Sequence, residues 1–423
     1  MKIMVVGGGG REHAIIKKIK QSKLVDKIYA LPGNGGIAED AECVAIGAKE
    51  IDKIVDFALA NKIDYAIVAP DDPLVLGAVD ALSKCGIPCF GPNANAAIIE
   101  GSKIFSKNLM KKYGIPTAKY EVFTDKEDAL EYLKNAPVPT VIKADGLALG
   151  KGVVIAMTRN EAFDAVKSMM EDKVFGDSGS KIVIEEFLTG PEVSVLSFTD
   201  GKTVVPMISS MDHKRALDGD NGLNTGGMGT IAPNPYYTNE IADRCMKEIF
   251  IPTIDAMNKE GRTFKGCLYF GLMLTKDGPK VIEYNCRFGD PETQVVLPLL
   301  KGDLLQIMMA CTNGTLAETK VEFSQKSACC VVMASKGYPA KYDSGFEIIR
   351  DNEINGEIYV AGAKLENGKL LSAGGRVLGV VAIGDNLGDA IKNAYGSVKH
   401  VRFENAFYRK DIGKRAMLVY NQK

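Results

Sequence analysis

The sequence predicts a protein of several domains with α/β and α+β architecture, and three observations lead to this prediction. Short apolar runs alternate with helical patterns over the first hundred residues, which is typical of a doubly wound parallel sheet. A compact unit with a glycine-rich loop follows over residues 120–188. Beyond it the strands lengthen and are interrupted by Asp200-Gly201 and Lys276-Asp277-Gly278, which are hairpin turn signals.

Hydrophobic periodicity and the positions of glycine and proline place the individual elements. In the N-terminal part we expect strands over 3–6, 28–31, 65–68 and 89–90, and helices over 12–21, 51–60, 74–85 and 101–113. In the compact unit we expect helices over 127–134 and 160–171, and strands over 140–143, 153–156 and 181–186. The later strands are expected over 193–198, 204–209, 268–275, 280–285, 328–334 and 377–383.

The composition excludes several functional classes. The 423 residues carry 52 Lys and Arg against 53 Asp and Glu, so no electrostatic footprint for nucleic acid or an acidic membrane is present. The first residues run into a strand pattern rather than a signal peptide, and no apolar run approaches the roughly 18 residues of a membrane span. Nine Cys without a C-x-x-C pair indicate reduced thiols rather than disulfides or a zinc site. We therefore expect a cytoplasmic protein without nucleic-acid or membrane partners.

A glycine turn, Gly7 to Gly10, separates the first strand from the first helix. Such a turn exposes backbone N–H groups at a helix N-terminus, which suits a phosphate. A dinucleotide site is disfavoured, because the G-x-G-x-x-G pattern would need glycine in place of Glu12 or His13. Two interpretations stay open, a phosphate-binding turn for a smaller ligand and a turn that only lets helix and strand pack.

A second glycine-rich loop, residues 146–152, follows a strand that ends near Lys143. A lysine at a strand end can neutralise an α- or β-phosphate, and a loop with three glycines and Lys151 can fold over a triphosphate. The loop is not a P-loop, because Gly152 follows Lys151 where Ser or Thr would hold magnesium. The pattern indicates a lid over ATP, with a plain flexible hairpin as the alternative.

Two further strand ends carry polar groups. The strand before Gly190-Pro191 ends in a hinge over 185–188, whose backbone could bind an adenine edge, with Glu192 beyond it for ribose hydroxyls; a plain inter-domain hinge is the alternative. Glu283 and Asn285 are two residues apart on a strand and therefore point to one face. Carboxylate and amide oxygens suit Mg²⁺, which completes its shell with phosphate oxygens and water.

A charged cluster, Asp212-His213-Lys214-Arg215, precedes the glycine-containing segment 224–229. Solvated charge runs are common and need no function. A glycine loop that follows one favours a ligand site, because glycine lets backbone approach a ligand closely.

Taken in order, these motifs resemble the ATP-grasp ligases, and most closely the family of phosphoribosylamine–glycine ligases (glycinamide ribonucleotide synthetases). The resemblance extends from residue 3 to about residue 300, and the matching segments are GGGGREHA at 7–14, PGNGG at 32–36, FGP at 90–92, EGSK at 100–103, KADGLALGKGV at 143–153, EEFL at 185–188, DHKRA at 212–216, NTGGMG at 224–229 and EYNCRFGDPETQ at 283–294.

This resemblance implies an ATP-grasp fold in four pieces. They are an N-terminal doubly wound domain over 1–102, a central ATP-grasp domain over 103–120 and 189–324, a lid subdomain over 121–188 and a C-terminal domain over 325–423. It also implies ATP-dependent ligation of glycine to 5-phosphoribosylamine with Mg²⁺ or Mn²⁺, in purine biosynthesis. Glycine, 5-phosphoribosylamine and ATP are then the partners, and we expect a monomer, with a weak dimer as the alternative.

The resemblance also implies roles for individual residues. The ATP-binding set is Lys103, Lys143, Gly150, Lys151, Gly152, Glu185, Glu186, Phe187, Leu188 and Glu192. The substrate-binding set is Gly8, Gly9, Gly10, Arg11, Glu12, Asn34, Gly35, Asp71, Asp72, Asn224, Thr225, Gly226, Gly227, Met228 and Gly289. The catalytic set is Arg287, Asp212, Lys214 and Asp290, and the metal ligands are Glu283 and Asn285.

One departure from the family pattern concerns the sugar. After the third strand the family reads G-P-E-x-P-L, and this chain has Asp71 where the glutamate would reach the sugar hydroxyls. Asp71 is one methylene shorter, and Asp72 could share the contact. There are three rival interpretations. The N-terminal and 224–229 motifs count against another ATP-grasp enzyme, and the glycine spacing counts against a nicotinamide-dependent oxidoreductase. The predicted metal pair counts against a non-catalytic nucleotide sensor.

Overall fold

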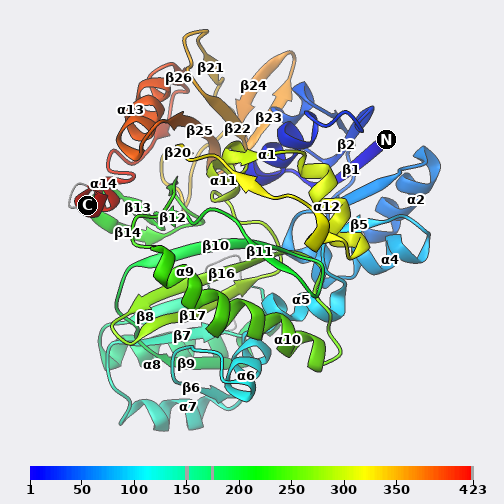
Figure 1. Cartoon of the computed structure of the whole chain (residues 1–423). Coiled ribbons are helices and arrows are strands. Elements are labelled where there is room, and N and C mark those ends of the chain that lie inside the picture. The colour runs from blue at the N-terminus through cyan, green and yellow to red at the C-terminus, as the bar shows by residue number, and fades with distance from the viewer. Residues whose placement is uncertain (148–151, 173–175, 421–423) are drawn as a thin grey trace.

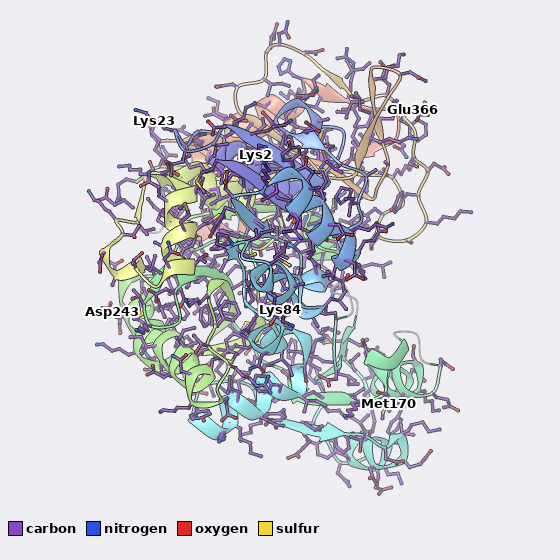
Figure 2. The ribbon with its side chains drawn as sticks, turned by 90° about the vertical axis from the view of Figure 1, so that its right-hand side faces the viewer. Lys2, Lys23, Lys84, Met170, Asp243 and Glu366 are labelled. Carbon is purple, nitrogen blue, oxygen red and sulfur yellow. The ribbon has the colours of Figure 1, made fainter. Side chains whose placement is uncertain are left out.

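Four larger sheets form the described part of the protein. The computed structural model describes residues 1–147, 152–172 and 176–420. In Figure 1 the N-terminal and C-terminal sheets lie together at the top, a central sheet lies below them, and a small sheet forms the bottom. Figure 2 shows from the side that the unit carrying Met170 projects away from the body, which holds Lys2 and Glu366 at its far end.

The N-terminal sheet is parallel, as the sequence predicts, with the strand order β3-β2-β1-β4-β5. Its strands are β1 (Lys2–Gly7), β2 (Lys27–Pro32), β3 (Glu42–Cys43), β4 (Tyr65–Val68) and β5 (Cys89–Phe90). Chain order reverses between β1 and β4, and ligands of open α/β sheets bind at the carboxyl ends of strands at such a point. The glycine turn follows β1 and Asp71 follows β4, so both lie at this switch point.

The side chains of β1 point alternately into the two largest hydrophobic cores. Ile3 and Val5 face one core, and Met4 and Val6 face the other, in accord with the two-residue period of a strand. The helices of this part are α1 (Gly10–Ile19), α2 (Ile51–Asn61), α3 (Asp71–Val75), α4 (Ala78–Lys84) and α5 (Ala94–Gly101). The helix predicted over 74–85 is wrong as a single element, because Gly77, with a φ of 86°, separates α3 from α4.

The small sheet at the bottom of Figure 1 has the order β6-β9-β7-β8, with antiparallel neighbours throughout. Its strands are β6 (Tyr120–Phe123), β7 (Thr140–Ala144), β8 (Val153–Ala156) and β9 (Ile182–Glu186). Helices α7 (Lys126–Leu133) and α8 (Arg159–Met170) supply most of the remaining side chains of its own hydrophobic core. Helix α6 (Lys103–Tyr113) leads into this unit.

The central sheet has the order β11-β10-β16-β17 and is antiparallel. Its strands are β10 (Glu192–Thr199), β11 (Val204–Pro206), β16 (Gly266–Thr275) and β17 (Gly278–Asn285). Both predicted hairpins are confirmed, because β10 pairs with β11 and β16 with β17. Helices α9 (Asn239–Cys245) and α10 (Ile251–Lys259), joined by a π-helical segment over Met246–Phe250, lie in front of this sheet in Figure 1.

The C-terminal sheet combines segments from distant parts of the chain. Its order is β12-β15-β20-β25-β22, and β27 (Ala406–Phe407) also pairs with β20. The strands are β12 (Met211–Asp212), β15 (Gly229–Ala232), β20 (Ser327–Ser335), β22 (Glu357–Val360) and β25 (Arg376–Gly384). The predicted domain boundary at 325 therefore runs through one continuous sheet, because β12 and β15 come from the segment assigned to the central domain.

The remaining elements connect these sheets. Helices α11 (Thr293–Leu299) and α12 (Leu304–Asn313) contribute to the same core as α1, and α13 (Leu387–Val398) covers the C-terminal sheet. The two-stranded sheets are β13 (Arg215–Leu217) with β14 (Asn221–Asn224), β18 (Leu300–Lys301) with β19 (Glu322–Phe323), β21 (Ile349–Arg350) with β26 (Val401–Arg402), and β23 (Ala363–Glu366) with β24 (Lys369–Ser372); α14 spans Lys414–Tyr420. No helix in the described ranges has the length and apolar character to cross a membrane.

Candidate active site

The glycine turn after β1 is tightly packed and holds two carboxylates. The Gly9 N–H donates to Glu12 Oε2 at 2.6 Å, and the Arg11 N–H donates to Asp290 Oδ2 at 3.3 Å. A side chain on Gly8 would meet the Gly33 carbonyl oxygen at 2.3 Å. The sequence suggests that this turn offers N–H groups to a phosphate, but Gly9 and Arg11 already donate to carboxylates. An anion bound by these two donors would have to displace Glu12 and Asp290.

Asn34 and Gly35 contact the C-terminal part of the chain. Asn34 Nδ2 donates to the carbonyl oxygens of Gly8 at 2.9 Å and Val360 at 2.7 Å. The Gly35 N–H donates to the Ala363 carbonyl oxygen at 2.9 Å. Both residues are in the predicted substrate-binding set, and both lie between the glycine turn and β22 to β23.

Asp71 and Asp72 point in different directions. Asp71 Oδ2 lies 3.8 Å from Arg287 Nη2, whereas Asp72 Oδ2 lies 2.6 Å from Lys49 Nζ, on a lysine that is 66% exposed. Burial opposes ionisation of Asp71, but the charges of Arg287 and Arg11 hold its pKa below the ordinary value. Asp71 is therefore the carboxylate directed toward the other predicted site residues.

Arg287 is held by a carboxylate that was not among the predicted site residues. Its Nη2 donates to Glu100 Oε1 at 2.9 Å and to Asn285 Oδ1 at 3.1 Å. Glu100 Oε2 in turn accepts the Cys286 N–H at 2.7 Å. Burial raises the pKa of Glu100, although the Arg287 charge opposes this. The Nε of Arg287 is buried and has no hydrogen-bond partner within the described ranges.

Lys103 and Lys143 are the predicted phosphate-binding lysines, and Lys143 shares the carboxylate of Glu185 with a third lysine, Lys107. Lys143 Nζ lies 3.1 Å from Glu185 Oε1 and donates to the Ile282 carbonyl oxygen at 3.0 Å. Lys107, from the same helix as Lys103, lies 3.0 Å from Glu185 Oε2. Burial lowers the pKa of Lys107 to about 8, against the opposing charge of Glu185. Lys103 Nζ donates to the Gly146 carbonyl oxygen at 2.7 Å, which links α6 to the start of the glycine-rich loop.

The remaining predicted ATP-binding residues lie in two segments of the chain, one at the end of β9 and one just before β8. Glu186, the last residue of β9, and the following Phe187 and Leu188 are partly buried, and Glu186 lies 3.3 Å from Lys280 Nζ. Gly152 is buried just before β8. Gly150 and Lys151 lie outside the described residues.

Glu283 and Asn285 lie at the end of β17, as the sequence predicts. Glu283 Oε1 is 3.9 Å from Lys214 Nζ, and Glu192 Oε2 is 3.3 Å from the same ammonium group. Burial opposes ionisation of Glu283, but the charges of Lys214 and Lys143 hold its pKa below the ordinary value. An ionised carboxylate with an amide oxygen two residues away fits Mg²⁺ or Mn²⁺. No cluster of three or more His, Cys, Asp or Glu suited to a metal occurs in the described part of the chain, so phosphate oxygens and water would supply the remaining ligands.

The partly buried Asp212 and the buried Glu292 form a pair of interacting acids beside these groups. Glu292 Oε1 accepts hydrogen bonds from the hydroxyls of Ser194 at 3.2 Å and Tyr269 at 3.3 Å. Burial and the charge of Glu292 raise the pKa of Asp212 well above its ordinary value. Burial also raises the pKa of Glu292. A side chain on Gly289 would meet Glu292 Oε2 at 2.4 Å, so this predicted residue packs against the acid pair.

The segment 224–229 is fixed by two side chains of the C-terminal part. Arg376 Nη1 donates to the carbonyl oxygens of Gly226 at 2.7 Å and Asp290 at 3.0 Å, and Nη2 lies 3.3 Å from Asp290 Oδ1. The Gly226 N–H donates to the Tyr338 hydroxyl at 3.1 Å. Gly227 has a φ of 113°, and a side chain there would meet Asp212 Oδ1 at 2.6 Å.

The other predicted members of this segment lie farther from the acids. Thr225 Oγ1 donates to the Lys214 carbonyl oxygen at 2.8 Å, Asn224 is exposed on β14, and Met228 is fully buried. The buried Met228 side chain belongs to the hydrophobic interior, so only its backbone could face a ligand.

Four residues of this site were missed by sequence reasoning. Glu100 belongs to the EGSK motif at 100–103, and Lys107 follows Lys103 by one helical turn. The sequence therefore contained a pattern from which both residues could have been predicted. Glu292 stands two residues after Asp290 in the strand-end motif. Arg376 carried no local signal, because its partners Gly226 and Asp290 are distant in the chain.

Comparisons with known proteins find relatives that match nearly the whole chain. The N domain of phosphoribosylglycinamide synthetase matches residues 1–100, its ATP-grasp (A) domain matches residues 101–293, and its C domain matches residues 328–415. The curated phosphoribosylamine–glycine ligase of Caldanaerobacter subterraneus subsp. tengcongensis is 50% identical over 97% of this chain and 99% of its own length. That of Clostridium acetobutylicum is 48% identical over 98% of this chain and its full length.

Solved structures show the same relationship. The crystal structure of the phosphoribosylamine–glycine ligase from Thermotoga maritima has a TM-score of 0.86 at 33% identity, covering 97% of this chain and 100% of that chain. The biotin carboxylase domain of the Hydrogenobacter thermophilus 2-oxoglutarate carboxylase, at 16% identity and a TM-score of 0.75, covers 96% of this chain and 91% of that one and shares the fold alone. The chain has the ATP-grasp fold and belongs to the phosphoribosylglycinamide synthetase family.

Proposed function

We propose that this chain catalyses the ATP-dependent ligation of glycine to 5-phosphoribosylamine in de novo purine biosynthesis, giving glycinamide ribonucleotide, ADP and phosphate. The observation that carries this function is the match to curated phosphoribosylamine–glycine ligases, which are between 46% and 50% identical over nearly their whole length. The reaction forms a carbon–nitrogen bond at the cost of one ATP. The proposal includes a cytoplasmic location for the protein, in keeping with its nine cysteines, which are all free thiols.

The first step activates glycine. A glycine carboxylate oxygen attacks the γ-phosphorus of ATP, the bond to the β–γ bridging oxygen breaks, and glycyl phosphate and ADP form. Phosphoryl transfer needs positioning and charge neutralisation more than covalent help from the protein. Lys143 and Lys103 would neutralise the ATP phosphates, and the segment 185–188 with Glu192 would hold the nucleoside. The hydrogen bond from Lys143 Nζ to the Ile282 carbonyl oxygen supports this role, because it fixes the ammonium group, and Glu185 Oε1 lies 3.1 Å from the same group.

Glu283 and Asn285 would hold a divalent cation, Mg²⁺ or Mn²⁺, which supplies charge neutralisation on the phosphates when bound. The two metals can be distinguished by competition. Mn²⁺ binding to the protein with ATP, followed by electron paramagnetic resonance, should weaken strongly in Glu283→Gln, and added Mg²⁺ should displace Mn²⁺ at a concentration that gives the relative affinity.

The second step forms the amide. The amine nitrogen of phosphoribosylamine attacks the carbonyl carbon of glycyl phosphate, the bond from that carbon to the phosphate oxygen breaks, and the nitrogen loses a proton. We assign Arg287 to the glycine carboxylate, because its planar fork matches a carboxylate and its Nε has no protein partner in the described ranges. Asp212 and Asp290 would hold the glycine ammonium group or a sugar hydroxyl. Asp71, which faces Arg287, would contact the sugar.

Water would hydrolyse the acyl phosphate, so the site has to close during the reaction. The small sheet projects from the body (Figure 2), and Lys103 Nζ donates to the Gly146 carbonyl oxygen just after β7 of that sheet, so the position of this sheet suits a cover over the nucleotide. The rival function is another ATP-grasp ligation with a different acid or amine, since these share the same fold.

The decisive experiment is to measure ADP release by the purified protein with MgATP, glycine and freshly prepared phosphoribosylamine, omitting each in turn. We expect release that requires all three, with glycinamide ribonucleotide as the product identified by mass spectrometry. ADP release that requires a different amine or acid would overturn the substrate assignment and favour the rival ligation.

A further inference from the structure

The free edge of β22 is held by two side chains from the N-terminal part of the chain, one from helix α1 and one from the loop after β2. β22 is the last strand of its sheet and pairs with β25 on one side only. On the other side, the Val360 N–H donates to His13 Nδ1 at 2.8 Å, and the Val360 carbonyl oxygen accepts from Asn34 Nδ2 at 2.7 Å. Two side chains therefore occupy the position where a further strand would bond.

His13 is fully committed to this contact. A backbone N–H can only donate, so Nδ1 is the acceptor and the ring proton is on Nε2, which lies 3.1 Å from Asp40 Oδ2. The residue is 2% exposed, and its ring stands edge-on to Tyr359. With both nitrogens bonded and the ring buried, His13 has no group left for a ligand.

Asn34 is committed in the same way. Its second amide hydrogen goes to the Gly8 carbonyl oxygen at 2.9 Å, and its Oδ1 accepts the N–H groups of Gly36 at 2.8 Å and Ile37 at 2.9 Å. One amide group thus joins the glycine turn, its own loop and β22. The close approach requires a glycine, because a side chain on Gly36 would meet Val360 Cγ2 at 2.3 Å.

A second connection joins the C-terminal sheet to the glycine turn between β1 and α1. β25, the partner of β22, begins at Arg376, which binds the carboxylate and carbonyl groups of Asp290. The Asp290 carboxylate accepts the Arg11 N–H at the start of α1. The glycine turn between β1 and α1 is therefore fixed to the C-terminal sheet at two places, through Asn34 and through Asp290.

We infer that His13 and Asn34 are positioning residues, which fix the glycine turn Gly7–Gly10 against the C-terminal sheet and thereby set the binding site for phosphoribosylamine. This inference rests on the proposed function for the identity of the ligand. Asn34 acts through the Gly8 carbonyl and the Val360 carbonyl rather than by touching the substrate, and His13 acts through the Val360 N–H.

The test uses the full-length protein, three single variants and the double variant of His13 and Asn34. Asn34→Asp retains the acceptor for Gly36 and Ile37 but loses both donors. His13→Phe retains a ring against Tyr359 but loses the acceptor. Lys17→Met is the matched control, because Lys17 crosses the same interface to Glu357 through an exposed ion pair without touching the turn. Steady-state kinetics for each substrate is combined with amide hydrogen exchange, read by mass spectrometry, over residues 7–12 and 357–363.

We expect Asn34→Asp and His13→Phe each to raise the KM for phosphoribosylamine at least tenfold, with the KM values for MgATP and glycine within twofold of the unmodified protein. Exchange should accelerate in both peptides, and the double variant should show less than the sum of the two effects, because both substitutions release the backbone of the same residue, Val360. Lys17→Met should change neither the KM values nor the exchange over residues 7–12; exchange over 357–363 is not compared for this control, because its partner Glu357 lies in that peptide.

Two results would overturn the inference. The first is a raised KM in Asn34→Asp with unchanged exchange at 357–363, which would mean direct contact with the substrate. The second is unchanged exchange at 7–12 in both variants. If His13→Phe fails to fold, Asn34→Asp decides alone. If the unmodified protein does not use phosphoribosylamine, the proposed function fails, and faster exchange in both peptides would still support the mechanical link.

Discussion

The ammonium group of Lys107 lies 3.0 Å from Glu185 Oε2, and neither side chain is more than 3% exposed. The other oxygen of Glu185 lies 3.1 Å from Lys143 Nζ. One buried carboxylate therefore holds two lysines, of which we propose only Lys143 as a ligand of the nucleotide phosphates. Lys107 also donates to Thr117 Oγ1 at 2.8 Å, so it anchors the carboxylate to the body of the protein.

Lys107→Met should destabilise the protein, because it leaves part of the Glu185 charge without a partner in a buried position. Removal of one member of a buried ion pair costs about 3 to 5 kcal/mol in the free energy of unfolding. Urea denaturation followed by circular dichroism measures this. Lys112→Met is the control, because Lys112 pairs with Glu260 at the surface. Equal stability of the two variants would contradict the proposed anchoring.

Lys143→Ala should lower kcat/KM for MgATP by orders of magnitude while the protein stays folded. The residue supplies a positive charge where the ATP phosphates are expected, and its loss leaves Lys107 to neutralise Glu185. Initial rates of ADP release measure the effect, and an unchanged circular dichroism spectrum controls for folding. Near-normal turnover would exclude Lys143 from phosphate binding.

Asp71→Asn and Asp72→Asn should differ sharply. Asp71 faces Arg287 and is the candidate for the sugar hydroxyls, so its amide variant should raise the KM for phosphoribosylamine about tenfold or more, the effect of losing a charge-assisted hydrogen bond. Asp72 pairs with the exposed Lys49, so Asp72→Asn should have kinetics close to those of the unmodified protein. The reverse order would show that Asp72 shares or replaces the contact.

Arg376→Met should impair catalysis, although Arg376 lies outside the sequence motifs that predict the site. The substitution removes the donors that hold Gly226 and Asp290 together, so the segment 224–229 should lose its fixed position. We expect kcat to fall at least tenfold with the KM for MgATP little changed, since the loss of one buried charged donor costs about 1.5 to 3 kcal/mol. Arg402→Met is the control, because the exposed Arg402 pairs with Asp351 away from this segment.

The free energy of unfolding should fall as the pH drops from the pKa of His213 in the unfolded chain to its pKa in the native protein. Burial and the positive charge of Arg409 lower the pKa of His213 to about 4, whereas an unfolded histidine titrates near 6.5. Between these values the unfolded chain binds a proton that the native protein does not, so the free energy of unfolding decreases with falling pH by up to about 1.4 kcal/mol per unit. Urea titrations from pH 7 to 4 should show a smaller decrease for His213→Gln. An unchanged decrease would mean that other groups dominate.

Much of the site could be predicted from local sequence. Glu283 and Asn285 lie two residues apart on one strand, so the two-residue period alone placed them together at the end of β17. The glycine turn, the hairpins and the parallel N-terminal sheet also follow from local patterns, because turn chemistry and periodicity act over a few residues. The break between α3 and α4 was missed, because a single glycine inside an apolar pattern does not by itself decide whether a helix ends.

The sequence by itself determined the types of the main elements, the order of the motifs and the resemblance to a family of ATP-dependent ligases. The tertiary structure decided which carboxylate faces which cation. Asp71 rather than Asp72 turns toward Arg287, Glu100 takes one edge of that arginine, and Arg376 reaches Asp290 from a strand 86 positions later in the chain. These choices depend on contacts between residues far apart in the sequence, and the packing of sheets that sets such contacts has no local pattern to predict it.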